Sequence, residues 1–412
     1  MNQPAIKTVS LSSRGMTRSP LELATPLPSL ASQAALPKVW LGAQSAFGLS
    51  LPQAKPTATQ LYAPRGVWID HRRLIVCDSG NHRVLIWNQI PTCDGQPADV
   101  VLGQQDFLSE GPAQGTGEYE RGMHLPTAAI VYENRLLVAD AWHHRILVWE
   151  EIPTHSDTRP DYCIGQERLD LVQPNQGSAP TGNSFYWPYG MAMIAGRFYV
   201  TDTGNRRVLA WDGLPDSNRP ADWILGQSNC YASEENRGGP VSARSFRWPH
   251  SVTGDEQGVW IADAGNHRVL GWSPHPSEDC DANWVLGQPD MLSAQENPYR
   301  AQGERALRFP YGICSDRERL LVADTSNNRI LFWKLPLTQK CFDGAIDLIG
   351  QFDFDQCGEN RWQCVSRDSL CWPYGISSCS SQLAIADSGN NRVMIWDCAS
   401  ILSNQSEEND EV

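Results

Sequence analysis

Paired acidic and basic residues recur along this sequence at one fixed separation, and they are the first candidates for chemistry. In six places an aspartate is followed five residues later by an arginine, inside a ten-residue phrase such as DSGNHRVLIW. The pairs are Asp78 and Arg83, Asp140 and Arg145, Asp202 and Arg207, Asp263 and Arg268, Asp324 and Arg329, and Asp387 and Arg392. Such a set could bind anions or act catalytically, but a site rarely needs six equal copies. We therefore interpret the pairs as structural repeat residues.

The spacing of these pairs predicts the elements that hold them. Successive aspartates are 62, 62, 61, 61 and 63 residues apart, and two further phrases keep the same step: VLGQ at Val101 and its equivalents, and a proline usually followed two residues on by glycine. Each unit contains four short β-branched and aromatic segments bounded by Gly, Asn, Asp and Pro, without a sustained helical period. Six such units bury both faces of each sheet only by packing around an axis. We predict an all-β, six-bladed propeller of four-stranded antiparallel blades.

The ends of the repeat array predict how the ring closes. The last unit stops after Trp396 without a fourth strand, whereas VWLGAQ at Val39 is a fourth strand without a unit. We expect residues 38–44 to complete blade six, which removes an open sheet edge. The predicted propeller covers 38–398, with blades at 61–104, 123–166, 185–227, 246–288, 307–351 and 370–398. Residues 1–37 and the acidic tail 399–412 are predicted to be disordered.

The phrase Asp-x-Gly-Asn-x-Arg, followed by Val or Ile and a strand that ends in Trp, resembles the NHL-repeat family. The resemblance covers roughly residues 38–398 and rests on six copies of the repeat. It implies six blades but not one function, because relatives include RNA- and protein-binding propellers, a lyase and, more distantly, metal-dependent lactonases.

The repeated residues have predicted structural roles. The aspartate is expected to accept hydrogen bonds from backbone N–H groups of the turn that follows it. The glycine of the turn, Gly80 in the first unit, suits a positive φ. The arginine is expected to pair with a nearby aspartate, and an aspartate on the neighbouring blade is one candidate. The turn residues His82, His144 and His267 are expected to face solvent.

A first candidate site lies where the blades meet the axis. The residue after each blade-opening proline should ring the mouth of the central channel. These residues are Arg65, Thr127, Tyr189, His250, Tyr311 and Tyr374. A few polar groups among aromatic rings suit a small binding mouth, although packing around a narrow axis would use the same residues. The aromatic residues just before the prolines, Trp187 among them, are expected to pack blades together.

A second candidate surface lies on the loops between blades, which are about 20 residues long and should share the face of the mouth. Loops on a rigid scaffold are where binding residues concentrate. The candidates there are Trp142, Arg244, Arg247, Arg305 and Arg308. The net charge of −14 disfavours nucleic acid as a partner, since nonspecific affinity for it comes from clustered Lys and Arg.

No motif in the sequence identifies a reaction. We predict a non-catalytic, monomeric binding scaffold for a protein partner, acting through the loop face without cofactor or metal. The alternatives are a lyase or lactonase with its site at the channel mouth, and an RNA-binding propeller. The sequence has no apolar run long enough for a membrane span and no signal-like stretch, so a cytoplasmic location is predicted. The 12 cysteines are then interpreted as reduced thiols, with a disulfide or metal site among Cys357, Cys364 and Cys371 as alternatives.

Overall fold

The computed structural model of the protein describes residues 36–43, 56–296, 302–316 and 318–397. The predictions of disorder for 1–37 and 399–412 therefore fall almost entirely outside the described residues, as do Gln44 of the predicted closing strand and the last predicted propeller residue, Cys398. Within the described ranges, no helix is long and apolar enough to cross a membrane.

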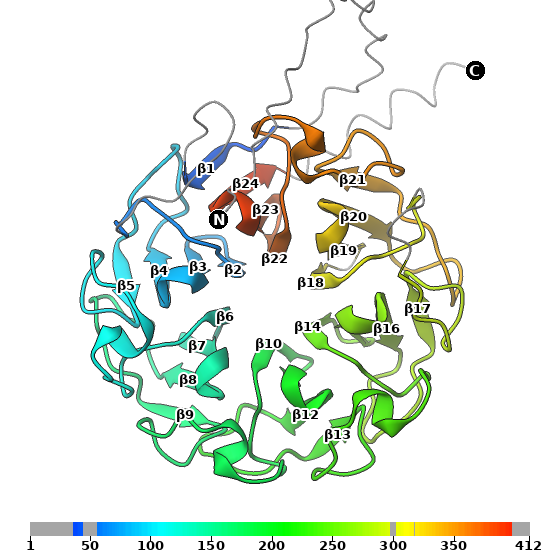
Figure 1. Cartoon of the computed structure of the whole chain (residues 1–412), viewed down its shortest axis with the longest axis horizontal. Coiled ribbons are helices and arrows are strands. Elements are labelled where there is room, and N and C mark those ends of the chain that lie inside the picture. The colour runs from blue at the N-terminus through cyan, green and yellow to red at the C-terminus, as the bar shows by residue number, and fades with distance from the viewer. Residues whose placement is uncertain (1–35, 44–55, 297–301, 317, 398–412) are drawn as a thin grey trace, which may run out of the picture. The chain divides into compact units, whose positions relative to one another are not determined.

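Six four-stranded antiparallel sheets form a ring, as predicted (Figure 1). Their strands are β2 (Gly66–Ile69), β3 (Leu74–Asp78), β4 (Arg83–Trp87) and β5 (Val100–Leu102); β6 (Pro126–Tyr132), β7 (Arg135–Asp140), β8 (Arg145–Trp149) and β9 (Tyr162–Ile164); β10 (Pro188–Ile194), β11 (Arg197–Asp202), β12 (Arg207–Asp212) and β13 (Trp223–Leu225); β14 (Pro249–Gly254), β15 (Val259–Asp263), β16 (Arg268–Trp272) and β17 (Trp284–Leu286); β18 (Pro310–Ser315), β19 (Arg319–Asp324), β20 (Arg329–Lys334) and β21 (Asp347–Ile349); and β22 (Pro373–Cys379), β23 (Gln382–Asp387), β24 (Arg392–Asp397) and β1 (Val39–Gly42). The innermost strands β2, β6, β10, β14, β18 and β22 contact one another in turn, and β22 contacts β2, so the ring is closed.

Short 3-10 turns are the helical elements of the described residues. Six of them follow the repeat aspartates: η1 (Ser79–Asn81), η3 (Ala141–His143), η5 (Thr203–Asn205), η7 (Ala264–Asn266), η8 (Thr325–Asn327) and η10 (Ser388–Asn390). Four lie in the long loops: η2 (Pro112–Gly115), η4 (Pro174–Gly177), η6 (Glu235–Gly238) and η9 (Glu359–Trp362).

The predicted closure at β1 is confirmed. β1 pairs antiparallel with β24, and Leu41 lies opposite Val393. Trp40 covers the guanidinium of Arg392, 4.0 Å from its ring centre. The strand nearest the N-terminus thus completes the blade built from the last repeat, which leaves no unpaired edge at the seam.

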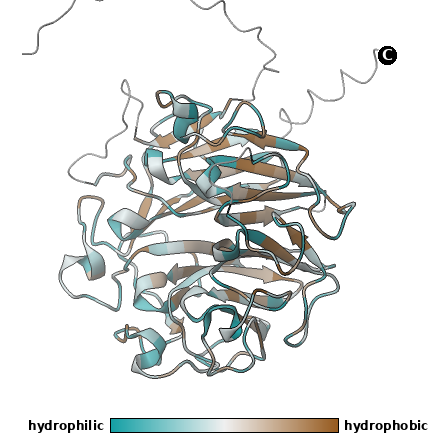
Figure 2. Cartoon of the chain, turned by 45° about the vertical axis from the view of Figure 1, so that its right-hand side comes forward, coloured by the Kyte–Doolittle hydropathy of each residue, from teal (hydrophilic) through white to brown (hydrophobic). Residues whose placement is uncertain are grey.

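The core lies between neighbouring blades. Figure 2 shows hydrophobic residues along the strands and hydrophilic residues in turns and loops. The cluster between blades one and two, for example, packs Val84 and Ile86 of β4 against Leu136 and Val138 of β7. The third strand of each blade, such as β4, is buried along its length because a sheet covers each of its faces.

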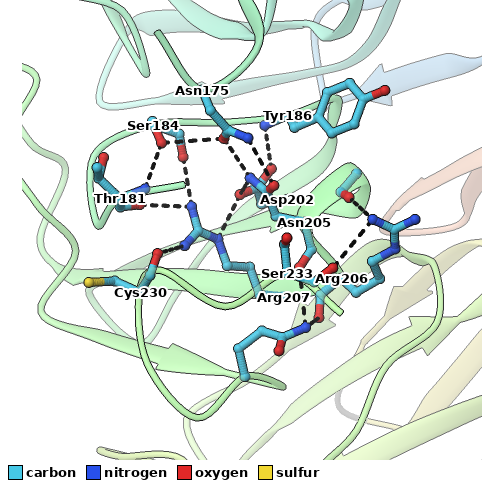
Figure 3. A network of polar contacts seen from close by, with 12 residues as sticks. Asn175, Thr181, Ser184, Tyr186, Asp202, Asn205, Arg206, Arg207, Cys230 and Ser233 are labelled. Atoms are coloured by element: carbon cyan, nitrogen blue, oxygen red, sulfur yellow. Dashed lines mark hydrogen bonds and ion pairs between the residues drawn. The ribbon is translucent and has the colours of Figure 1, made fainter. Parts of the chain in front are cut away.

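Each repeat pair is an ion pair within one blade, and blade three shows the pattern (Figure 3). Asp202 Oδ2 accepts hydrogen bonds from Arg207 Nε and Asn205 Nδ2, both at 2.7 Å. Asp202 Oδ1 accepts from the backbone N–H of Tyr186, two residues before the blade-opening proline. These contacts support the structural interpretation, but the structure corrects two details of it. The partner is not on a neighbouring blade, and the backbone donor precedes the strand instead of lying in the turn.

The rest of the guanidinium anchors the long loops. Arg207 donates from Nη2 to the carbonyls of Thr181 and Ser184 and from Nη1 to the carbonyl of Cys230. Thr181 and Ser184 belong to the loop before blade three, and Cys230 belongs to the loop after it. In blades one to five one buried arginine therefore fixes two successive loops to the turn, with its charge balanced by the aspartate.

The glycine of the turn has a different role from the predicted one. The residue with positive φ stands two positions later: φ is 56° at His82, and the equivalent residues of the other blades also have positive φ. The φ angle of Gly80 is not positive. A Cβ on Gly80 would lie 2.6 Å from the carbonyl oxygen of Tyr62. The glycine is required because the turn packs directly on the backbone that enters the blade.

Turn side chains also join each blade to the next. Thr325 Oγ1 donates to the carbonyl of Pro373, and Ser388 Oγ donates to that of Pro64, both at 2.6 Å. In every blade except the third, where Arg206 stands, the residue at positive φ accepts a backbone N–H from the following blade, as His144 Nδ1 does from Trp187. His267 does the same for Phe309 at 3.2 Å.

These links correct the expectation that the turn histidines face solvent. His144 and His267 are 8% and 3% exposed, because each is enclosed between two blades. His82 is half-buried and accepts a hydrogen bond from the backbone of Leu125.

Candidate functional site: the channel mouth and the surface around it

The channel mouth is built by a bulge in the innermost strand of most blades. In blades two to six the pairing with the second strand shifts register just after the blade-opening proline, for example between Pro188 and Met191. A bulge turns the extra side chain out of the regular alternation. It leaves Tyr189 and its equivalents at the inner end of the blade.

Glycine after the mouth residue lets adjacent blades approach. A Cβ on Gly66 would lie 2.5 Å from the carbonyl of Thr127, and one on Gly375 would lie 2.5 Å from that of Arg65. The Pro-x-Gly phrase thus encodes close contact of successive blades around the axis.

All six predicted mouth residues line one central cavity of about 190 Å³. Their rings are in contact across the axis. His250 lies edge-on between Tyr189 and Tyr311, with ring centres 4.3 Å from each. Tyr311 stacks on Tyr374 at 4.7 Å, and the guanidinium of Arg65 lies 5.3 Å from the centre of the Tyr374 ring. The prediction that these positions share the mouth is confirmed.

The ring is asymmetric. Thr127, Tyr189 and His250, from blades two to four, are buried. Arg65, Tyr311 and Tyr374, from the adjacent blades one, five and six, are only half-buried. The cavity therefore has an accessible side formed by one cation and two tyrosines.

Burial keeps the mouth side chains other than Arg65 uncharged at neutral pH. It lowers the pKa of His250 to about 3, and His250 Nδ1 donates to the carbonyl of Trp248 at 2.8 Å. Burial raises the pKa of Tyr311 to about 12 and raises the pKa of Tyr189 and Tyr374 as well. Arg65 opposes that rise in all three tyrosines, which shows that the three hydroxyl groups lie near one guanidinium.

A second feature lies beside the mouth, where blade two departs from the repeat. Tyr119, His124, Trp142, His143 and Trp187 form what we call the blade-two aromatic cluster. Neighbouring rings in it lie 5.5 to 6.1 Å apart. Trp142 is 47% exposed, as its turn position suggested. Trp187 joins the cluster to the mouth, 6.2 Å from the ring of His250.

The sequence contains a signal for this departure that our sequence analysis missed. In blades three, four and six an asparagine of the long loop bonds the turn asparagine 30 residues later, as Asn175 does with Asn205 (Figure 3). In blade two the same two positions hold Ala113 and His143. His143 instead bonds Asp140 at 2.9 Å. Burial raises the pKa of Asp140, but His143 and Arg145 outweigh it and bring the pKa to about 2.

The four predicted loop arginines are not equivalent. Arg247 and Arg308 lie beside the turns, where they pair with Glu235 and Glu296. The other two reach the loops between the third and fourth strands, so they are displaced toward the outer edge of the ring. Arg244 pairs with Asp281 there, and Arg305 donates to the carbonyl of Phe342.

Metal ligands and disulfides were the remaining possibilities considered from the sequence. Across the described ranges, no group of three or more His, Cys, Asp or Glu side chains is placed to hold a metal ion. Cys357, Cys364 and Cys371 form no disulfide with any cysteine that the structure describes.

Comparisons with known proteins complete the description. No family model matches the chain. The human NHL repeat-containing protein 3 is 31% identical over 133 residues, which is 32% of this chain and 33% of that protein. The match therefore spans about a third of the curated relative's length.

Solved β-propellers resemble the chain at low sequence identity. The WD40 propeller domain of Doa1 has 12% identity and a TM-score of 0.42, covering 87% of this chain and 97% of that one. A streptogramin B lyase has 12% identity and a TM-score of 0.39, covering 87% and 98%. A nidogen/laminin complex has 15% identity and a TM-score of 0.43, covering 82% and 97%.

The six repeats, the closed ring of blades and the NHL match lead to one conclusion. This chain is a six-bladed β-propeller whose repeats are similar to those of an NHL repeat-containing protein.

Proposed function

We propose that the protein is a binding scaffold whose partner is another protein, docked on the surface formed by the long loops and the turns between second and third strands. The observation that carries the proposal is where exposed large apolar side chains lie. Among the described residues, only Leu36 and Ile346 lie elsewhere. The others are Tyr62, Leu108, Tyr119, Trp142, Tyr186, Tyr231, Leu292, Phe352, Trp362 and Trp372. Exposed aromatic side chains are enriched at protein interfaces.

Anchoring of the loops supports a docking role. In blades one to five the arginine of the repeat holds the loops on both sides of its blade through backbone carbonyls, as Arg207 does, and Arg392 of blade six holds the loop before it. A surface that is already ordered loses less conformational entropy when a partner binds.

Trp142 is the best candidate for the centre of the docking surface. At this turn position blades one, three, four and six have glycine and blade five has Ser326. Trp142 projects from a rigid turn and contacts Trp187 of the next blade. A half-exposed tryptophan on a fixed backbone is typical of an interface hot spot.

The test compares Trp142→Ala with Ile346→Ala, which removes an exposed apolar side chain from a loop between third and fourth strands. Partners of the full-length protein are identified by affinity purification and quantitative mass spectrometry. We expect Trp142→Ala to reduce recovery of the specific partners at least tenfold, as loss of a hot spot of about 2 kcal/mol or more would. Ile346→Ala should leave recovery unchanged, and both variants should melt like the parent. Equal recovery with Trp142→Ala and the parent protein would contradict the proposed surface.

A further inference from the structure

The channel mouth has an unbalanced positive charge. Arg65 makes no ion pair with a described residue, in contrast to the six repeat arginines, each of which is paired with an aspartate. Among the described residues that line the cavity, none is Asp or Glu. In a chain whose net charge is −14, a cavity whose one charged side chain is an arginine favours an anionic ligand.

A buried hydroxyl beside Arg65 has no acceptor among the described residues. Tyr189 is 5% exposed, and its hydroxyl lies next to the Arg65 guanidinium, which can only donate, so the hydroxyl hydrogen is left without an acceptor. Buried polar atoms are normally paired, so one that is not calls for an explanation such as a missing ligand. A tyrosine hydroxyl can donate to a ligand oxygen, and a guanidinium can only donate.

The number of charges limits the ligand. Burial keeps His250 neutral, with its pKa near 3, and keeps the tyrosines protonated. The site thus offers one positive charge, surrounded by ring faces whose electron density repels a second negative charge. A monoanion matches this balance, and a planar carboxylate matches the fork of a guanidinium in two parallel hydrogen bonds.

Size and lining restrict the ligand further. The cavity of about 190 Å³ corresponds to roughly six water molecules at ~30 Å³ each. Its walls at the accessible side are the rings of Tyr311 and Tyr374, stacked at 4.7 Å. These walls suit a short aliphatic or single-ring substituent.

We propose that the channel mouth binds a small monocarboxylate. Its carboxylate pairs with Arg65 and accepts a hydrogen bond from the Tyr189 hydroxyl, while the rings of Tyr311 and Tyr374 cover its apolar part. The site adjoins the proposed protein-docking surface through Trp187, but its ligand requires no partner protein.

Calorimetric titration of the full-length protein tests the proposal. The probes are propionate and benzoate, with propionamide and benzamide as uncharged controls of the same shape. We expect both carboxylates to bind and each amide to bind at least tenfold more weakly. Equal affinity for acid and amide, or no heat of binding with either acid, would overturn the proposal.

Variants show whether binding occurs at the mouth. Arg65→Met should raise the dissociation constant for benzoate at least tenfold, and Tyr189→Phe should raise it severalfold. Tyr189→Phe keeps the ring and removes only the hydroxyl whose hydrogen has no acceptor, so this variant should fold even if the Arg65 variant does not. Arg168→Met removes the same charge from an exposed loop site, where Arg168 pairs with Asp170, and should leave binding unchanged. If Tyr189→Phe and Arg65→Met each bound benzoate as tightly as the parent protein, the assigned site would be refuted.

Two other anion sources are distinguished in the same experiment. Inorganic phosphate should bind more weakly than benzoate, since only one cation faces it. A tetrapeptide with a free C-terminus carries the same chemical group on a larger molecule. Tenfold tighter binding of either probe than of benzoate would reject a small free carboxylate as the ligand.

Discussion

At the scale of single residues, the turn position with positive φ determines how neighbouring blades are linked. His144 and Asn328 both occupy this left-handed conformation, and each accepts a backbone N–H from the next blade. An imidazole can accept at Nδ1 only when that nitrogen carries no proton. Burial lowers the pKa of His144 and of His267 to about 4, so both are neutral at physiological pH.

The lowered pKa of His144 makes stability depend on pH. Its stabilising effect is complete above pH 6.5, the ordinary pKa, and is lost as pH falls toward about 4, because the unfolded chain takes up a proton first. His144→Asn should keep the hydrogen bond to Trp187, as Asn328 does for Trp372, but not titrate.

We expect the free energy of unfolding of His144→Asn to fall less than that of the parent between pH 6.5 and 4. The difference should reach up to about 3 kcal/mol, at about 1.4 kcal/mol per unit of pKa shift. Urea unfolding at several pH values measures it, and His71→Asn, at an exposed turn, is the control. Parallel curves for the His144 variant and the parent would disprove this linkage.

Residue-scale prediction from the sequence was partly successful. Six equal copies correctly indicated that Asp202 and Arg207 are structural. The sequence did not show that Arg207 also binds loop carbonyls, because backbone acceptors leave no signature in residue type. It did not separate Gly80 from His82 as the residue with positive φ, because glycine suits both positive φ and close packing.

At the scale of elements, blade two shows a paired replacement. The backbone of Ala113 donates to the carbonyl of Met123, as that of Asn175 does to Phe185, so the two loops have equivalent conformations. In blade two the small side chain of Ala113 in the loop faces the larger side chain of His143 in the turn. Blades three and six instead pair two asparagines at these positions. The exchange keeps the volume similar, which cores tolerate best.

A double-mutant cycle tests whether this exchange is coupled. Ala113→Asn and His143→Asn should each destabilise the fold, the first by crowding His143. The second would keep the bond to Asp140, as Asn205 bonds Asp202, but would leave the asparagine without its loop partner. The double variant should restore an asparagine pair. Its loss of unfolding free energy should be about 0.5–3 kcal/mol smaller than the sum of the losses in the two single variants. Thermal and urea unfolding measure the coupling, and strictly additive changes would show that the two positions are independent.

Element-scale prediction was incomplete for the long loops. We interpreted them from their length as binding segments and missed that Asn175, Asn236 and Asn360 recur at near-repeat spacing and bind the turns. Their positive φ values also recur. The signal was present, but a single asparagine per loop is hard to recognise without knowing its partner in space.

At the scale of the whole molecule, ring closure brings the six mouth residues together from across the chain. Repeat geometry alone predicted their convergence, since equivalent positions must meet at the axis. The asymmetry of the cavity could not be predicted, because it depends on how Tyr189 and His250 fill space beside Arg65. The mouth therefore exists only while blade six is complete.

Closure rests on β1, and one substitution tests it most directly. Leu41 is 1% exposed and packs with Val393, whereas Leu36 is 59% exposed just before the strand. Leu41→Asp would bury an unpaired charge at the seam and should lower the free energy of unfolding by about 3 kcal/mol or more, with Leu36→Asp close to the parent. Hydrogen exchange should show β22 and β24 losing protection together in the Leu41 variant. If the Leu41 and Leu36 variants both unfolded at the same midpoint denaturant concentration as the parent, closure by the N-terminal strand would be contradicted.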